Sequence, residues 1–114
     1  KAIKFKPDYV EAYSNLGVTL KELGRLNEAE LCHKQAIKLK PDYAEAHNNL
    51  GNTLRELGRL NESKASLMQS IGLRPNYAEA HNNLGITLTE LGRFTAVIIL
   101  VYVLFILFSY ILHN

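Results

Sequence analysis

The sequence has little cysteine, and this limits its covalent chemistry. Of the 114 residues only Cys32 is a cysteine, so a disulfide within the chain is excluded. A single thiol is compatible with a reducing compartment, and we expect a cytoplasmic protein. Cys32 and His33 do not suggest a catalytic pair, because adjacent residues of a helix point about 100° apart and do not face each other.

An excess of charge of either sign is also absent. The 13 lysines and arginines and the 11 aspartates and glutamates alternate along the sequence, and the formal net charge is +2. A protein that binds nucleic acid neutralises phosphates with a clustered basic surface. We therefore expect no nucleic-acid partner.

Motifs for catalysis, cofactors and metals are missing as well. No glycine-rich phosphate loop follows a strand pattern, and no pair of carboxylates lies in an apolar setting that would shift a pKa. His47 and His81 are of the residue type that binds metals, but they stand 34 positions apart without a cysteine or carboxylate at ligand spacing. The sequence predicts neither an enzyme nor a cofactor or metal site.

A repeat of 34 residues organises what is present. Residues 41–74 match residues 7–40 at 20 of 34 positions, and the same proline and tyrosine recur as Pro7, Pro41 and Pro75 and as Tyr9, Tyr43 and Tyr77. A fixed period of this length is typical of stacked helix-turn-helix units. We expect an all-α fold with residues 1–6 as the end of a preceding repeat, 7–40 and 41–74 as two units, 75–93 as the first helix of a third, and 94–114 as an apolar C-terminal helix.

Each unit carries signals for two helices. Capping boxes predict the starts of the first helices at Asp8 with Glu11, Asp42 with Glu45, and Asn76 with Glu79. Leucines at helical spacing predict one buried face, namely Leu16, Leu20 and Leu23, then Leu50, Leu54 and Leu57, then Leu84, Leu88 and Leu91. Glycine favours helix ends, at Gly24, Gly58 and Gly92, and asparagine favours the starts of second helices, at Asn27 and Asn61.

These residues together resemble the tetratricopeptide repeat from Lys1 to about Arg93. Small residues stand where that family needs close helix contacts, at Gly17, Gly51, Gly85, Ala29 and Ala36, and Pro41 and Pro75 close the units. Departures are Ser63 and Ser70 in place of alanines, and His47 and His81 in place of an aromatic residue. The resemblance implies an α-solenoid of antiparallel helix-turn-helix hairpins, a fragment of a right-handed superhelix.

One polar position recurs in all three first helices, as Asn15, Asn49 and Asn83. Stacking of repeats places such residues in a row on one surface, and each amide can both donate to and accept from the main chain of an extended peptide. The row is similar to that of the protein O-linked N-acetylglucosamine transferase type, which implies that it holds a peptide. Further candidate peptide-binding residues on this face are Asn48, Asn52, Asn82, Lys21 and Arg55.

Three functions follow from this pattern. The first is a non-catalytic scaffold that binds a protein or peptide segment in a concave groove. The second is the substrate-presenting arm of a larger glycosyltransferase, and the third is a structural repeat without a ligand. Docking of chaperone C-termini is not favoured, because Lys21 and Arg55 correspond to the uncharged Thr89 in the third unit.

The repeat pattern is lost after Arg93. None of the 24 charged residues lies between Phe94 and Asn114, and a helix over Phe94 to Leu112 is about 28 Å long against a hydrocarbon core of about 30 Å. A membrane anchor, an apolar tail such as a shifted reading frame produces, and a buried helix all remain open. In water we expect this helix to fold back onto Leu84, Leu88 and Leu91, to expose an apolar outer face, and to self-associate.

Overall fold

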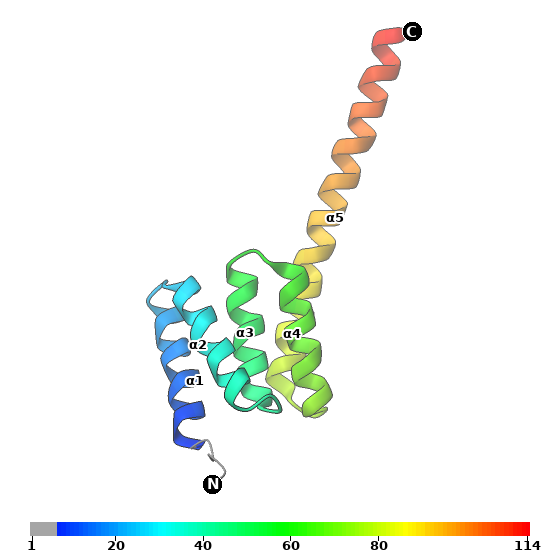
Figure 1. The fold of residues 1–114 in the computed structure, drawn as a ribbon. Helices are drawn as coiled ribbons and strands as arrows, with labels where there is room; N and C mark the ends of the chain where they lie inside the picture. The colour runs from blue at the N-terminus through cyan, green and yellow to red at the C-terminus, as the bar shows by residue number, and fades with distance from the viewer. Residues whose placement is uncertain (1–6) are drawn as a thin grey trace.

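The computed structural model describes residues 7–114, and over this range it contains five α-helices and no strand (Figure 1). The helices are α1 (Pro7–Glu22), α2 (Leu26–Leu39), α3 (Ala44–Glu56), α4 (Leu60–Leu73) and α5 (Ala78–His113). Helices α1 to α4 lie side by side as antiparallel neighbours, and the first part of α5 packs on α3 and α4. The predicted all-α solenoid of helical hairpins is confirmed. Residues 1–6, expected to end a preceding repeat, lie outside the described range.

Two glycines form the turns inside the hairpins, as their spacing predicts. Gly24 has φ 79° and Gly58 has φ 81°, a left-handed conformation that costs a residue with a β-carbon about 1–2 kcal/mol. The next residue then closes the helix end, because the Arg25 amide donates to the Leu20 carbonyl at 2.8 Å and the Arg59 amide to that of Leu54 at 2.9 Å.

The predicted caps of the first helices are wrong by one residue in α3 and α5, and α1 begins at Pro7, before the predicted cap Asp8. Tyr43 and Tyr77 occupy the N-cap positions of α3 and α5, and neither helix has a side-chain cap bond. The cause is the turn that precedes each helix: the amide of Tyr43 donates to the Lys40 carbonyl at 3.1 Å, so the Asp42 position belongs to this turn. The side chain of Asp8 lies outside the described part of the chain.

The predicted caps of the second helices are also wrong. Helices α2 and α4 begin at Leu26 and Leu60, one residue before the asparagines, and Arg25 and Arg59 hold the N-cap positions. Each of these arginines forms an ion pair with a glutamate three residues on, and Arg59 contacts Glu62 at 2.6 Å. A carboxylate in the first turn of a helix is favourable, so Glu28 and Glu62 stabilise these helix starts, although neither helix has a side-chain cap bond.

Close contact between the two helices of a hairpin occurs at glycine. A β-carbon added to Gly17 would lie 2.5 Å from Cε1 of His33, and one added to Gly51 would lie 2.6 Å from Cγ of Leu67. Both facing side chains are fully buried. The small residues Ala29 and Ala36 are fully buried as well, so the positions that the resemblance assigns to close packing are packed.

The predicted leucine face is only partly buried. Leu20, Leu50 and Leu54 are buried, but the exposed fraction is 49% for Leu16, 66% for Leu23 and 45% for Leu88. Leu16 lies on α1 and Leu88 on α5, the helices at the two ends of the stack, where a neighbouring unit covers one side only. Leu23 lies in the turn between α1 and α2.

Helix α5 does not end at Gly92, which corrects the predicted helix end. It continues for 36 residues and projects from the body of the protein (Figure 1), so the segment does not fold back onto Leu84, Leu88 and Leu91. The sequence gives a physical reason. Arg25 and Arg59 each have a glutamate three residues later, whereas Arg93 has Ala96, so the ion pair that starts α2 and α4 cannot form. The prediction of a helix over residues 94–112 itself is confirmed.

Candidate functional site

Three successive first helices contribute to one hollow on the surface. Its volume is about 210 Å³, and it is lined by Val18 and Lys21 of α1, Asn49 and Asn52 of α3, Glu79 of α5, and His33 of α2. We call these six residues the inter-repeat hollow. It joins the surfaces of three units, which is the arrangement that a ligand extended along the solenoid requires.

The row of asparagines is used in part to join the repeats. Nδ2 of Asn49 donates to Oγ of Ser14 at 3.1 Å, and Nδ2 of Asn83 donates to Oδ1 of Asn48 at 3.0 Å. Each bond runs from one first helix to the preceding one. Asn15 is exposed and Asn49 is half-buried, but Asn83 is only 6% exposed. The three residues therefore do not form the uniform exposed row that the sequence predicts.

Asn48 lies inside the protein instead of on the groove surface where the sequence places it. Its side chain is fully buried, and its Nδ2 donates to Oε1 of Glu79 at 3.2 Å while its oxygen accepts from Asn83. Both ends of this amide are therefore occupied by α5. Its structural role is to fix α3 against α5 and to hold Glu79 at the edge of the inter-repeat hollow.

The two basic candidates are also engaged with the next repeat. Nζ of Lys21 lies 3.3 Å from Oε2 of Glu56, and Nη1 of Arg55 donates to the Asn83 carbonyl at 3.4 Å. Lys21 lines the inter-repeat hollow and Arg55 does not. The positive charge of Lys21 is thus offset by Glu56, and the hollow does not present a cluster of unpaired cations.

Asn82 is exposed and lies elsewhere. It lines a separate surface region of about 580 Å³ on α5, together with Gly85, Ile86 and Thr89. A β-carbon on Gly85 would meet nothing within 4 Å, whereas Gly17 and Gly51 face a second helix. This region is therefore the open end of the stack, and the structure separates Asn82 from Asn49 and Asn52.

His33 is the member of the inter-repeat hollow that sequence reasoning did not assign to the site. Its ring is fully buried between α1 and α2, and burial lowers its pKa to about 4, with a smaller contribution from the charge of Lys21. The imidazole is neutral at pH 7. A signal was present in the repeat itself, because the equivalent residue 34 positions later is Leu67, and a histidine in place of a core leucine indicates an unusual polar position.

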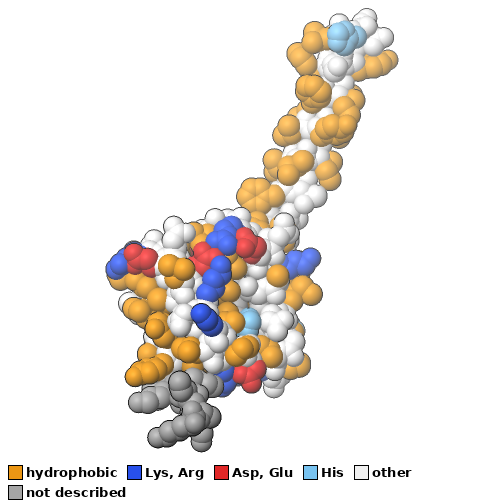
Figure 2. All heavy atoms as spheres, viewed as in Figure 1, with side chains coloured by type: hydrophobic (Ala, Val, Ile, Leu, Met, Phe, Trp, Pro, Cys, Tyr) orange, Lys and Arg blue, Asp and Glu red, His pale blue; other side chains and the backbone are white. Residues whose placement is uncertain are grey.

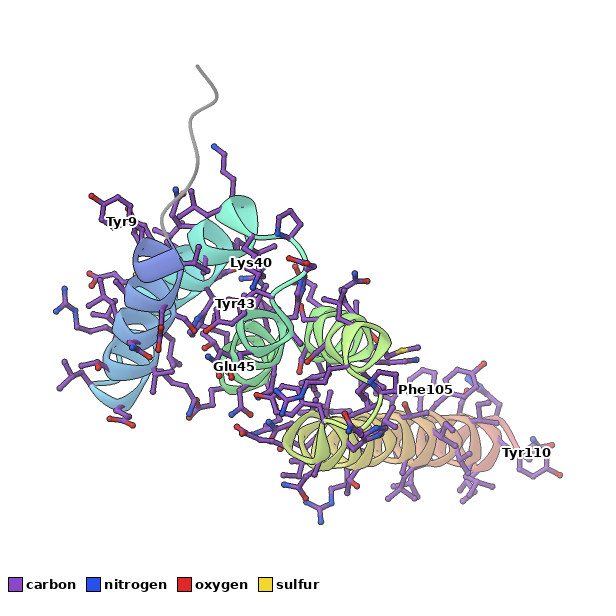
Figure 3. All side chains as sticks on the ribbon, turned by 90° about the horizontal axis from the view of Figure 1, so that it is seen from below. Tyr9, Lys40, Tyr43, Glu45, Phe105 and Tyr110 are labelled. Carbon is purple, nitrogen blue, oxygen red and sulfur yellow. The ribbon has the colours of Figure 1, made fainter. Side chains whose placement is uncertain are left out.

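The remaining candidate chemistry has structural explanations. Nε2 of His47 lies 2.8 Å from the Pro41 carbonyl, and Nε2 of His81 lies 2.7 Å from that of Pro75. Each ring therefore forms a hydrogen bond that stabilises the turn before its helix. In the same turn region Lys40 lies over the ring of Tyr43 (Figure 3). Within residues 7–114 no group of three His, Cys, Asp or Glu side chains could hold a metal ion.

The buried serines also have partners. Oγ of Ser63 donates to the Gly51 carbonyl at 2.7 Å, and Oγ of Ser70 donates to the Ala44 carbonyl at 2.8 Å. Burial of a hydroxyl is tolerated when it is hydrogen-bonded. The two departures from alanine therefore strengthen contacts between helices and do not create a site.

Helical hairpins stacked with a 34-residue period define a helical-repeat protein with a polar surface on its first helices. Family models agree: a TPR repeat model matches residues 19–54 and 51–92, and a tetratricopeptide repeat model matches residues 1–30. The chain belongs to the tetratricopeptide repeat family.

Two solved structures show the likeness in three dimensions. The second TPR domain of human RPAP3, solved in complex with the HSP70 peptide SGPTIEEVD, is 27% identical with a TM-score of 0.66 over 68% of this chain and 65% of that one. A mutant O-GlcNAc transferase of Thermobaculum terrenum is 36% identical with a TM-score of 0.69 over 72% of this chain but only 16% of that one. No curated protein matches the chain.

Proposed function

We propose that this chain is a non-catalytic protein-interaction scaffold that holds an extended peptide segment along the surface of α1, α3 and α5. The observation that carries the proposal is the inter-repeat hollow, because side chains of three successive units line it. Asn15 is exposed, and Asn49 uses only its Nδ2 in the bond to Ser14, which leaves amide groups that can bond to a peptide main chain.

The similar structures support the same class of function. The RPAP3 domain was solved with a peptide, so a neighbour of this fold at 27% identity binds a peptide ligand. The ligand class differs in our proposal. Lys21 is paired with Glu56, and Arg55 with a backbone carbonyl, so we expect no tight binding of a peptide with an acidic C-terminus such as SGPTIEEVD.

Selection from a phage-displayed library of random dodecapeptides tests this proposal, with the full chain held in detergent micelles. We expect selected peptides whose affinity falls when Asn15→Ala and Asn49→Ala are combined. The matched control combines Asn27→Ala and Asn61→Ala, two exposed asparagines on the second helices, and should bind as the wild type does. A library that yields no binder, or equal binding by both double variants, contradicts the proposal.

The transferase-like neighbour raises the alternative of a substrate-presenting arm, in which the same surface would hold an acceptor protein. The scaffold and the substrate-presenting arm would use the same peptide-binding surface. They differ in whether a catalytic domain is attached to it. A search for a glycosyltransferase domain on the same polypeptide in longer transcripts distinguishes them.

We also propose that residues 94–112 cross a lipid bilayer and hold the scaffold at its surface. These residues are part of α5, which by length and composition could span a membrane. Their large apolar side chains are exposed by 45% at Val103 to 70% at Ile111. Figure 2 shows apolar side chains along the projecting helix, and Phe105 and Tyr110 point away from its axis (Figure 3). A helix that is apolar on every side suits lipid, whereas contact with one protein partner needs only one apolar face.

Flotation with phosphatidylcholine vesicles tests the membrane proposal. We expect the full chain to float with the vesicles and to resist extraction at alkaline pH. Val103→Arg places a charge near the centre of the span at a cost of about 2.5–3.5 kcal/mol and should reduce insertion, while Phe94→Arg at the edge should have little effect. The proposal would be refuted if the full chain were a soluble monomer or oligomer that does not float with the vesicles.

A further inference from the structure

Two departures from the repeat meet in the inter-repeat hollow. His33 of the first unit replaces the leucine seen at Leu67 in the second, and Asn52 of the second unit replaces the aliphatic residues seen at Val18 and Ile86 in the first and third. The residues lie on different helices, α2 and α3, yet both line this hollow. The first and second units therefore each contribute one polar group where the equivalent position in another unit is apolar.

Both polar groups lack partners inside the protein. Nδ1 and Nε2 of His33 and Oδ1 of Asn52 are buried and make no hydrogen bond within the described residues. Most buried polar side-chain atoms in proteins are hydrogen-bonded, and an unpaired one costs about 1–3 kcal/mol. Three such atoms around one hollow indicate a site that is completed by a group from outside.

The unpaired atoms specify the chemistry of that group. A neutral imidazole offers one N–H donor and one acceptor nitrogen, and Asn52 adds a carbonyl acceptor. The charged members of the hollow are Lys21 and Glu79, one of each sign, so the lining has no net charge to balance a charged ligand. The two ring nitrogens point in divergent directions, so one ligand group reaches only one of them. The complement is therefore a neutral group that carries both donors and an acceptor, which describes a primary carboxamide.

We propose that the inter-repeat hollow receives the side-chain carboxamide of a glutamine or asparagine from the bound peptide. One of its N–H groups donates to Oδ1 of Asn52, and the amide bonds to one ring nitrogen of His33, as donor or as acceptor according to the tautomer. This inference rests on the proposed peptide-binding function and adds the side chain that the surface selects.

The geometry favours a side chain over a single ordered water. The volume of about 210 Å³ is far above the roughly 10–15 Å³ that one water needs. Val18 supplies an apolar wall for the methylene groups of a glutamine. The unpaired atoms have almost no accessible surface, although their residues line the hollow. Binding therefore requires side chains of the lining to rotate, the Asn52 amide and the His33 ring among them, and side-chain rotations of this kind are common on binding.

The chain itself supplies matched variants for the test. His33→Leu reproduces the leucine that fits over Gly51, and Asn52→Val reproduces Val18, so both replacements have a precedent in another unit of the same fold. The probe is a dodecapeptide selected on the full chain in detergent micelles. Each of its positions is replaced in turn by Gln, by the apolar isostere Met, and by the charged isostere Glu, and dissociation constants are measured.

At one position we expect the peptide with Gln to bind about tenfold or more tightly than the peptides with Met or Glu, because the loss of one partner leaves buried groups unpaired. The double variant His33→Leu with Asn52→Val should reverse this order and prefer Met, with binding of the rest of the peptide retained. If no peptide binds the wild type, both proposals are wrong. If a peptide binds but no position prefers a carboxamide, or the double variant keeps the preference, the carboxamide inference alone is wrong.

Discussion

The ring of His33 packs directly on Gly17, where a β-carbon would approach Cε1 to 2.5 Å. Leu67 packs on Gly51 in the same way in the second hairpin, at 2.6 Å from Cγ. Both hairpins thus depend on one contact between a glycine of the first helix and a buried side chain of the second. In the third unit α5 continues straight, and no second helix covers Gly85.

This difference predicts opposite effects of the same substitution. Gly51→Ala should lower the free energy of unfolding by about 1–3 kcal/mol, because the new methyl group overlaps Leu67 and lies 3.3 Å from the Ser63 carbonyl. Gly85→Ala should raise it by about 0.5–1 kcal/mol, since alanine is the better helix former and the site is open. Thermal unfolding followed by circular dichroism measures both, and equal destabilisation would contradict the open end at α5.

His33 should make the stability of the protein depend on pH. Burial lowers its folded pKa to about 4, whereas an unfolded histidine has a pKa of about 6.5. The unfolded state therefore binds more protons between these values, so stability is complete above about pH 6.5 and falls as the pH drops toward 4, by an amount on the order of 3 kcal/mol. Urea unfolding of the wild type and of His33→Leu across this pH range measures how the free energy of unfolding of each depends on pH. The same pH dependence in both proteins would show that His33 is not buried as described.

The hairpins could be predicted from the sequence because their signals act within one unit. Gly24 and Gly58 adopt the left-handed conformation that their spacing indicates, and Ala29 and Ala36 are buried as the resemblance implies. The prediction that the first helix of the third unit ends at Gly92 was wrong, because it rested on this glycine alone. A glycine permits a turn but does not require one, and the ion pair that begins a second helix was missing at Ala96.

The candidate site was harder to predict because it depends on contacts between units. The pattern treats Asn15, Asn49 and Asn83 as equivalent, yet their burial differs with the neighbour that covers each one. Asn48 could not be recognised as a buried link to Glu79 and Asn83 from spacing alone. Comparison of His33 with Leu67 was available in the sequence and is the signal that locates the hollow.

Glycines at two matched positions provide a test of the straight helix. Neither Gly58 nor Gly92 has any atom within 4 Å of an added β-carbon, so only backbone conformation distinguishes them. Gly58→Ala should destabilise the fold by about 1–2 kcal/mol because φ is positive there. Gly92→Ala should stabilise it by about 0.5–1 kcal/mol, as in any helix interior. A loss of stability in both variants, measured by urea unfolding, would place a turn at Gly92.

The asparagine row should separate into structural and exposed members. Asn83→Ala removes the donor to Oδ1 of Asn48 and leaves that buried oxygen unpaired, so we expect a loss of about 1–3 kcal/mol in the free energy of unfolding. Asn15→Ala, at the exposed end of the row, should change it by about 0.5 kcal/mol or less. A double-mutant cycle between Asn48→Ala and Asn83→Ala should give a coupling of about 0.5–3 kcal/mol, because the two residues are in direct contact. Additive effects in this cycle would mean that the amide–amide bond between α3 and α5 does not form in solution.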